Sequence, residues 1–205
     1  MIKGITLLLL IGLSLSVCAQ VPAAAEDVCP IKIGEILPAL TFNTVEGESV
    51  NLKRVLQDKP AVLVFYRGGW CPYCNVQLGQ MQKIEQQLLD MGLQILAVSP
   101  DRPEKLKASL EKNDINYQLL SDSSMSASRS LGIAFKVDDE TVKVYKDKYK
   151  IDIEADSGFT HHQLPVPAVL IVDRQGVVQF SYINPNYKVR ADTDVILAAA
   201  RAVSK

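Results

Sequence analysis

The sequence predicts an α/β protein with a central mixed sheet flanked by helices, and three segments lead to this prediction. Residues 61–66 are an unbroken apolar and β-branched run, which is typical of a strand buried on both faces of a sheet. A helical pattern and a second apolar run at 93–98 follow, so these segments form a βαβ unit with parallel strands. Residues 168–172 form another buried strand, and a turn at 173–176 returns the chain at 177–182 as its antiparallel partner. A sheet that contains both pairings is mixed.

The remaining elements follow from periodicity and from signals at their ends. In the first helix, Leu78, Met81, Ile84 and Leu88 recur at helical spacing between polar residues, and Gly92 ends the helix. The other expected elements are, in chain order, a hairpin or strand extension within 34–58, a helix from 103 through 110, a strand at 117–120, a short helix at 126–131 and a final helix at 192–203.

One stretch fits neither a helical nor a strand pattern. From 136 to 150 the chain is rich in Lys, Asp and Tyr, and its apolar residues are irregularly spaced. A charged run of mixed sign is usually a solvated face. We therefore interpret this stretch as a surface insertion before the C-terminal hairpin and assign it no function.

Composition limits the class of protein. The chain has 205 residues, of which 48% are hydrophobic, and a net charge of -1. It is long enough for one well-packed domain, and its balanced charge argues against a nucleic acid partner. We expect a signal peptide at 1–19, a mobile N-terminal segment at 20–33 and one domain at 34–205.

The first 19 residues have the layout of a secretory signal peptide. Lys3 precedes the apolar run at 7–13, and small residues lead to a cleavage site after Ala19. The apolar run is too short to span a bilayer comfortably, so no transmembrane segment is expected after cleavage. The alternative is a lipid anchor on Cys18, although Val17 is larger than the residue usual before a lipidated cysteine. Either way we expect an exported protein, periplasmic or secreted, in a compartment that permits disulfides.

The chemistry of the sequence is concentrated at Cys71 and Cys74, where the strand at 61–66 passes into the first helix. The first turn of a helix has unpaired N–H groups and the positive end of the helix dipole, and both favour a thiolate. We therefore expect Cys71 to be the more acidic thiol. Pro72 fits a first-turn position that needs no N–H partner, and Cys74 can close a short disulfide on Cys71. The pattern predicts a thiol that attacks and a thiol that resolves.

Residues near this pair leave alternatives open. Trp70 and Tyr73 either shape the rim of a binding groove or pack against the first helix. Cys29 lies near the mature N-terminus, and we favour an incidental or intermolecular thiol over a resolving role.

The two histidines of the chain, His161 and His162, precede the strand at 168–172. One of them could exchange protons at the active site, but polar loop residues are the commoner case. Together with Cys71 and Cys74 they could also form a soft copper or zinc site, which is a remote alternative. Adjacent histidines on an extended stretch point in opposite directions, which weakens that alternative. Otherwise we expect no metal and no cofactor.

The order of elements, with a Trp-Cys-Pro-Tyr-Cys turn at 70–74 between the first strand and helix, resembles the thioredoxin fold. Val166 and Pro167 occupy the place of that family's cis-proline, so the resemblance implies a cis peptide bond between them that faces the cysteines. The closer resemblance is to the peroxiredoxins, the alkyl hydroperoxide reductase and thiol-specific antioxidant superfamily. Residues 34–40 look like their usual opening, and 74–77 are similar to the peroxidatic segment of the bacterioferritin-comigratory type.

This resemblance implies that Cys74 is the peroxidatic cysteine, but three positions depart from the family. Peroxiredoxins have a Thr or Ser three residues before that cysteine, a Pro seven before it, and an Arg ahead of a later strand. Here these positions hold Cys71, Arg67 and Pro167. Arg67 is close enough in sequence to both sulfurs to stabilise a thiolate or polarise a peroxide oxygen.

Two functions follow from these observations. Because the peroxide-holding residues are missing, the main hypothesis is an exported thiol-disulfide oxidoreductase of the antioxidant type, working through a redox-active Cys71–Cys74 disulfide. The alternative is a thiol peroxidase that reduces hydroperoxides with Cys74. The expected partners are an external thiol reductant, either a thioredoxin-like protein or a small thiol, and a hydroperoxide or protein disulfide as substrate.

Overall fold

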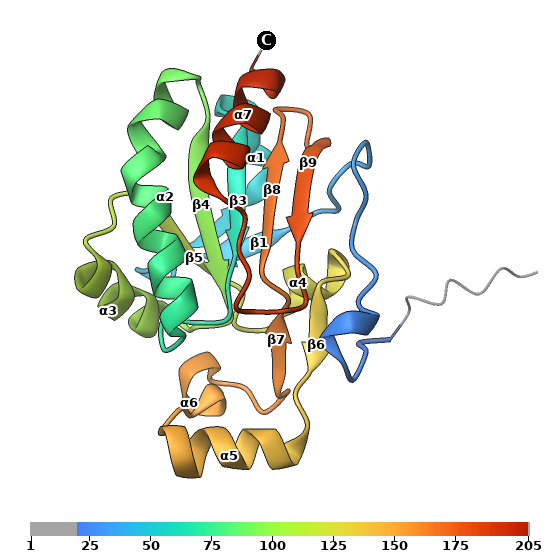
Figure 1. The fold of residues 1–205 in the computed structure, drawn as a ribbon, viewed down its shortest axis with the longest axis vertical. Coiled ribbons are helices and arrows are strands. Elements are labelled where there is room, and N and C mark those ends of the chain that lie inside the picture. The colour runs from blue at the N-terminus through green and yellow to red at the C-terminus, as the bar shows by residue number, and fades with distance from the viewer. Residues whose placement is uncertain (1–19, 205) are drawn as a thin grey trace, which may run out of the picture.

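A computed structural model describes residues 20–204, and the expected signal peptide and Cys18 lie outside this range. Helices cover both faces of a central sheet (Figure 1). The helices are α1 (Leu52–Asp58), α2 (Pro72–Asp90), α3 (Pro103–Asn113), α4 (Ser126–Ser130), α5 (Asp139–Tyr149), α6 (Ile153–Ser157) and α7 (Thr193–Val203), after a 3-10 turn at Ala25–Asp27. The strands are β1 (Thr41–Asn43), β2 (Ser49–Asn51), β3 (Ala61–Phe65), β4 (Gln94–Ser99), β5 (Gln118–Ser121), β6 (Ala134–Lys136), β7 (Gln163–Pro165), β8 (Ala168–Val172) and β9 (Val178–Ile183).

The central sheet is mixed, as predicted. Its strand order is β2-β1-β5-β4-β3-β8-β9. Strand β3 pairs in parallel with β4 and antiparallel with β8, and β8 and β9 form the expected C-terminal hairpin. The expected N-terminal extension is the antiparallel pair of β1 and β2. Strands β6 and β7 form a separate two-stranded sheet next to the insertion.

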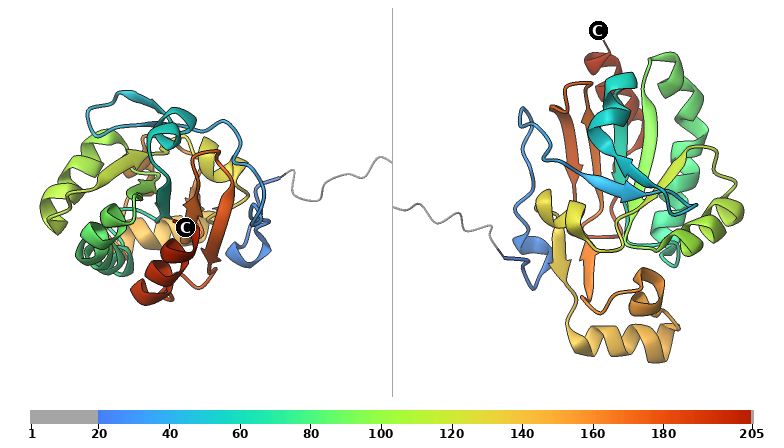
Figure 2. Two further views of the ribbon diagram at one scale, coloured as in Figure 1. Left: turned by 90° about the horizontal axis from the view of Figure 1, so that it is seen from above. Right: turned by 180° about the vertical axis from the view of Figure 1, so that it is seen from behind.

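Alternate residues of β3 build two apolar cores, one on each face of the sheet. Val62 and Val64 pack with α2, α3 and α7, whereas Leu63 and Phe65 pack with α1 and α4. Figure 2 shows α2 and α7 on one side of the sheet and α1 on the other. Because both faces of β3 are fully buried, the strand reads as a continuous apolar run in the sequence.

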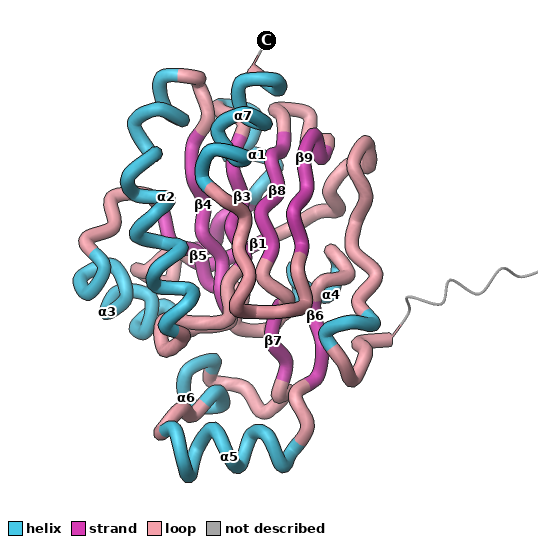
Figure 3. Tube along the Cα trace, in the orientation of Figure 1, coloured by secondary structure: helices cyan, strands magenta, loops and turns pink. Residues whose placement is uncertain are grey.

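The stretch at 136–150, interpreted as a surface insertion with no assigned secondary structure, is mostly the helix α5 (Figure 3). Asp138 caps this helix by accepting a hydrogen bond from the backbone N–H of Thr141 at 2.8 Å. No residue of α5 is fully buried, and only Thr141, Val142 and Tyr145 are half-buried, so its apolar face is narrow and lies among charged residues in the sequence. The short helix α6 follows and completes the insertion.

The N-terminal segment at 20–33 runs along α4 and β6. The backbone N–H of Lys136 donates to the carbonyl of Pro22 at 2.8 Å, and that of Ile31 donates to Leu131 at 3.0 Å. The mobility of this segment stays a prediction, as do the domain boundaries. Within 20–204, no helix is long and apolar enough to cross a bilayer.

Candidate redox site

Cys71 and Cys74 lie at the start of α2, where the sequence places them. Cys71 is the N-cap residue, Pro72 is the first helical residue, and the N–H of Cys74 donates to the carbonyl of Cys71 at 3.1 Å. Both cysteines are free thiols, and their exposed fractions are 1% and 0%. The interpretation of Cys29 as an incidental or intermolecular thiol stays a prediction.

Two glycines let the chain turn from β3 into α2. Gly68 has a φ of +141°, and a Cβ there would meet the indole nitrogen of Trp70. The backbone N–H of Gly69 donates to Oδ2 of Asp101 at 2.7 Å, and its carbonyl accepts a hydrogen bond from Nδ2 of Asn75 at 2.9 Å. These contacts fix the loop that positions the cysteines.

The two thiols act on each other's proton affinity. A hydrogen bond from the Cys74 thiol lowers the pKa of Cys71 to about 6, against the opposing effect of burial, and the charges of Arg67 and Arg190 lower it further. Burial raises the pKa of Cys74, and the hydrogen bond and the negative charge of Cys71 add to this effect. The reduced pair therefore shares one proton at neutral pH. Cys71 is the more acidic thiol, as expected, but the main cause is its neighbouring thiol.

Arg190 is a site residue that the sequence did not reveal. It lies in the loop between β9 and α7, and its Nη2 atom is 3.5 Å from Sγ of Cys74. A backbone hydrogen bond from Arg67 and the charge of Arg190 both act to lower the pKa of Cys74, against the larger effect of burial. Arg190 and Pro167 border one narrow space beside the pair. An arginine from another loop thus lies next to Cys74, while the position ahead of β8 holds Pro167. In the sequence, Arg190 is one of many charged residues, and its only distinguishing feature is that it lies shortly before the final helix.

Arg67 is nearly buried, with 4% of its surface exposed, and three aromatic rings surround its guanidinium group. The Cζ atom lies 4.2 Å from the ring centroid of Tyr187, 5.0 Å from that of Trp70 and 5.8 Å from that of Tyr145. Its Nη2 atom donates to the hydroxyl of Tyr145 at 2.5 Å. The Nε atoms of Arg67 and Arg190 are buried without a hydrogen-bond partner in the described part of the chain. Each of the two guanidinium groups therefore keeps one buried N–H that no group of residues 20–204 accepts.

The rim of the site is aromatic. Trp70 is half-buried, and its ring centroid lies 5.8 Å from that of Tyr145. Tyr73 is 43% exposed and meets Tyr187 edge-on at 5.8 Å. Tyr73 therefore lies on the rim, whereas Trp70 both borders the rim and packs against the core that α2 helps to form.

The cis-proline expected from the thioredoxin resemblance is wrong. Val166 and Pro167 are buried, but no cis peptide bond occurs in residues 20–204. The backbone N–H of Val166 donates to the carbonyl of Ile133 at 2.8 Å. Because Ile133 directly precedes β6, this bond extends the pairing of β6 with β7 by one residue. The chain thus runs straight from β7 into β8.

The histidines do not join the cysteines. Nε2 of His161 lies 2.9 Å from the carbonyl of Ser123, and burial lowers the pKa of this imidazole. His162 lies between the carboxylates of Asp139 and Glu154, at 3.1 and 2.8 Å. No group of three or more metal-ligating side chains occurs in the part of the chain that the structure describes. The copper or zinc hypothesis is therefore wrong, because the imidazoles are engaged elsewhere.

Asp101 is a second residue that the sequence did not single out. It follows β4, is 2% exposed and accepts the hydrogen bond from Gly69 beneath the cysteine loop. Burial raises its pKa to about 7. A carboxyl group that titrates near neutral pH therefore supports the loop that carries the redox pair.

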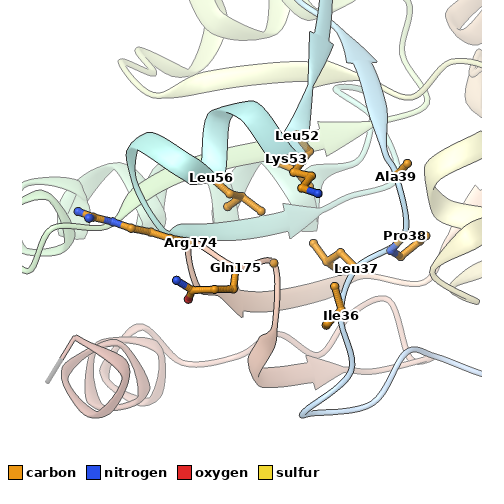
Figure 4. Close-up of a pocket in the computed structure, with 10 residues that line it drawn as sticks. Ile36, Leu37, Pro38, Ala39, Leu52, Lys53, Leu56, Arg174 and Gln175 are labelled. Carbon is orange, nitrogen blue, oxygen red and sulfur yellow. The ribbon is translucent and has the colours of Figure 1, made fainter.

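A separate cavity of about 300 Å³ lies between α1 and the turn that joins β8 to β9 (Figure 4). Leu37, Leu52 and Leu56 form part of its wall. Because Phe65 pairs with Ala168 at the cysteine end of β3, this turn lies at the opposite end of the sheet. The cavity is therefore distinct from the redox site.

Comparisons with known proteins agree with the fold and the site. A model of the AhpC/TSA family matches residues 33–181, more than half of the chain. Peroxiredoxin Bcp of Escherichia coli K12 is 33% identical over 104 residues, which cover 51% of this chain and 66% of that protein. A putative peroxiredoxin bcp of Haemophilus influenzae is 30% identical over 104 residues, which again cover 51% of this chain and 66% of that protein. The chain thus spans just under two thirds of the length of these relatives.

Solved structures share the fold at lower identity. Reduced Prx3 from Vibrio vulnificus in complex with H2O2 has a TM-score of 0.66 and 21% identity, over 83% of this chain and 99% of that one. Peroxidoxin BcpB from Mycobacterium tuberculosis has a TM-score of 0.65 and 18% sequence identity. The match covers 84% of this chain and 98% of that one. The predicted thioredoxin fold of the peroxiredoxin kind is confirmed. On the family match over residues 33–181, the chain belongs to the AhpC/TSA family.

Proposed function

We propose that this protein is a thiol peroxidase that reduces hydroperoxides with the Cys71–Cys74 pair. The observation that carries the proposal is the position of Arg190, whose Nη2 atom lies 3.5 Å from Sγ of Cys74. A peroxidase needs a cationic donor at the attacking sulfur, because negative charge moves from that sulfur to the leaving oxygen. The sequence alone favoured disulfide exchange because the peroxide-holding residues were missing at three positions, and Arg190 answers this objection for the missing arginine.

The reaction uses the single proton of the reduced pair. The proton passes from Cys74 to Cys71, and the Cys74 thiolate attacks the terminal oxygen of the hydroperoxide. An S–O bond forms as the O–O bond breaks, which leaves a sulfenic acid on Cys74 and an alkoxide that takes the proton from Cys71. The Cys71 thiolate then attacks the sulfenic acid sulfur, a Cys71–Cys74 disulfide forms and hydroxide leaves.

The names of the relatives support the substrate class. The matched proteins from Escherichia coli and Haemophilus influenzae are named peroxiredoxins, and the Vibrio vulnificus neighbour holds H2O2. We therefore infer that the substrate is a hydroperoxide and that an external thiol, such as a thioredoxin-like protein, reduces the disulfide. The aromatic rim of Trp70, Tyr73 and Tyr187 offers an apolar surface for such a thiol.

A second candidate function is dithiol-disulfide exchange, and one observation favours it. The pKa of Cys71 is lowered to about 6, so Cys71 is the thiolate of the resting pair and the better placed to attack a disulfide. In this reaction Cys74 would resolve the mixed disulfide. The two functions assign opposite roles to the two cysteines, which makes them separable by experiment.

We also propose that the protein works outside the cytoplasm, on the basis of the signal-like residues 1–19. Cell fractionation with N-terminal sequencing of the mature chain tests this. Recovery of a chain that begins after Ala19 from the exported fraction supports the proposal, and a chain that begins at Met1 in the cytoplasm contradicts it.

Mass spectrometry of single-turnover reactions tests the function. The Cys71→Ser and Cys74→Ser variants are reduced, mixed with one equivalent of H2O2 and trapped with a reagent specific for sulfenic acid. We expect Cys71→Ser to carry the adduct on Cys74, and Cys74→Ser to carry none within the same time. Trapping on Cys71 alone, or on neither variant, would contradict the peroxidase proposal. A mixed disulfide of Cys74→Ser with a protein disulfide substrate would instead support exchange.

A further inference from the structure

The insertion that the sequence left without a function reaches the redox site through one side chain. Figure 1 places α5 and α6 beyond the end of the sheet where α2 begins. No residue of α5 is buried, yet the hydroxyl of Tyr145 accepts the hydrogen bond from Nη2 of Arg67. The ring of Tyr145 also lies 5.8 Å from that of Trp70. Tyr145 thus connects this exposed helix to the turn that carries the cysteines.

Arg67 depends on this contact for its hydrogen bonding. Within residues 20–204, the Tyr145 hydroxyl is the one hydrogen-bond acceptor on its guanidinium group, and Nε has no partner. The rings of Trp70 and Tyr187 attract the cation through their faces, but such contacts are less directional than a hydrogen bond. The hydroxyl therefore decides where within the aromatic cage the charge lies.

The charge of Arg67 in turn acts on the cysteine pair. Its guanidinium lies 5.0 Å from the ring of Trp70, the residue before Cys71, and its charge lowers the pKa of Cys71. The other positive charge that faces the pair is Arg190, which comes from a different loop and reaches Cys74 directly. A change at Tyr145 therefore acts on the pair through Arg67.

Ion pairs and a backbone hydrogen bond hold the insertion that carries Tyr145 in place. Lys146 on α5 pairs with Asp152 at 2.8 Å, which ties α5 to the start of α6. Asp156 on α6 pairs with Lys105 of α3 at 2.9 Å, and its carbonyl accepts a hydrogen bond from the N–H of Arg102 at 2.8 Å. The insertion is thereby attached to the body of the domain at α3 and at the redox turn.

We propose that Tyr145 is a positioning residue that holds the Arg67 guanidinium beside the cysteine pair, so that the inserted helix completes the active site. The proposal deepens the peroxidase assignment and rests on it for its effect on turnover. Its effect on the thiolate does not depend on which substrate the pair attacks.

The test compares Tyr145→Phe with Tyr149→Phe, a change of the same kind on the same helix at a side chain that is 56% exposed. Phenylalanine keeps the ring next to Trp70 and removes only the hydroxyl. Two quantities are measured in each reduced protein: the pH midpoint of thiolate formation from ultraviolet absorbance, and the rate constant with H2O2. We expect Tyr145→Phe to raise the midpoint and to slow the reaction by about three- to tenfold, as loss of a hydrogen bond to a charged group should. Tyr149→Phe should match the wild type.

A double-mutant cycle tests whether the effect passes through Arg67. In an Arg67→Met background, Tyr145→Phe should have no further effect on either quantity. An undiminished effect in that background, or a Tyr145→Phe protein equal to the wild type in both quantities, would overturn the proposal. If the wild type does not consume peroxide but Tyr145→Phe still shifts the thiolate midpoint, the peroxidase assignment fails and the positioning role stands.

Discussion

The Nη2 atom of Arg190 lies 3.5 Å from Sγ of Cys74, although 116 positions separate the two residues in the chain. The contact forms because the loop between β9 and α7 passes the start of α2, where Pro167 and Gln77 border the same narrow space as Arg190. It gives a buried sulfur a cationic partner. The chain therefore meets one requirement of peroxide reduction with a residue from an unexpected place in the sequence.

Replacement of Arg190 tests that role. We expect Arg190→Gln to slow the reaction with H2O2 by about ten- to a hundredfold, because one preorganised donor to the developing charge is lost. The matched control is Arg201→Gln, which changes an exposed arginine near the end of α7. Rapid-mixing kinetics on the reduced proteins gives both rate constants. If the two variants react equally fast, Arg190 has no part in the chemistry.

Stability should depend on pH through Asp101. Burial raises its pKa from 3.8 to about 7, so between these values the folded chain binds more protons at this group than the unfolded chain does. The free energy of unfolding contributed by Asp101 therefore falls as the pH rises through this window and levels off above it. Asn at this position stays neutral and keeps an oxygen to accept the Gly69 hydrogen bond. We expect Asp101→Asn to be more stable than the wild type above neutral pH, by on the order of 3 kcal/mol.

Urea unfolding at several pH values measures this difference. The advantage of Asp101→Asn should shrink as the pH falls toward 3.8, where the wild-type carboxyl is also protonated. Asp58→Asn, at an exposed position, is the control and should show no such trend. A stability difference between Asp101→Asn and the wild type that is constant with pH would mean that Asp101 does not titrate as described.

The N-terminal segment should loosen when Gly132 is replaced. Gly132 has a φ of +66°, and a Cβ there would overlap the carbonyl oxygen of Cys29. We expect Gly132→Ala to displace the segment and to expose the bond after Lys32 to trypsin. Gly47→Ala is the matched control, since Gly47 also has a positive φ but a Cβ there would meet no atom within 4 Å. Equal cleavage rates after Lys32 in the two variants would show that the close approach at Gly132 does not hold the segment.

The parts of the fold that were predictable are those whose burial leaves a pattern in the sequence. Strands β3 and β8 are buried on both faces, and α2 buries one stripe of apolar residues, so runs and spacings revealed them. Helix α5 buries no residue and was therefore missed. The resemblance to thioredoxins suggested a cis bond before Pro167, which local sequence cannot determine and the structure does not contain within residues 20–204.

The part of the candidate site that is formed by neighbours in sequence could be predicted. The part that the fold brings together from distant positions could not. The cysteine turn at 70–74 could be located because a strand, two glycines and a helix surround it in sequence. Arg190 and Tyr145 reach the site across 116 and 78 positions, and neither has a neighbour that marks it. Asp101 has no mark in the sequence, since burial and not residue type gives it a raised pKa.

The reaction of the reduced protein with H2O2, followed by the fluorescence of Trp70, tests the central claim most directly. Trp70 is the single tryptophan of the chain and contacts Arg67, so it reports on the site alone. We predict a fast change in fluorescence in the wild type whose rate is proportional to the H2O2 concentration. Cys71→Ser should keep this first phase, and Cys74→Ser should lose it. A wild-type rate no greater than that of a small free thiol, or a fast phase that survives in Cys74→Ser, would contradict the account.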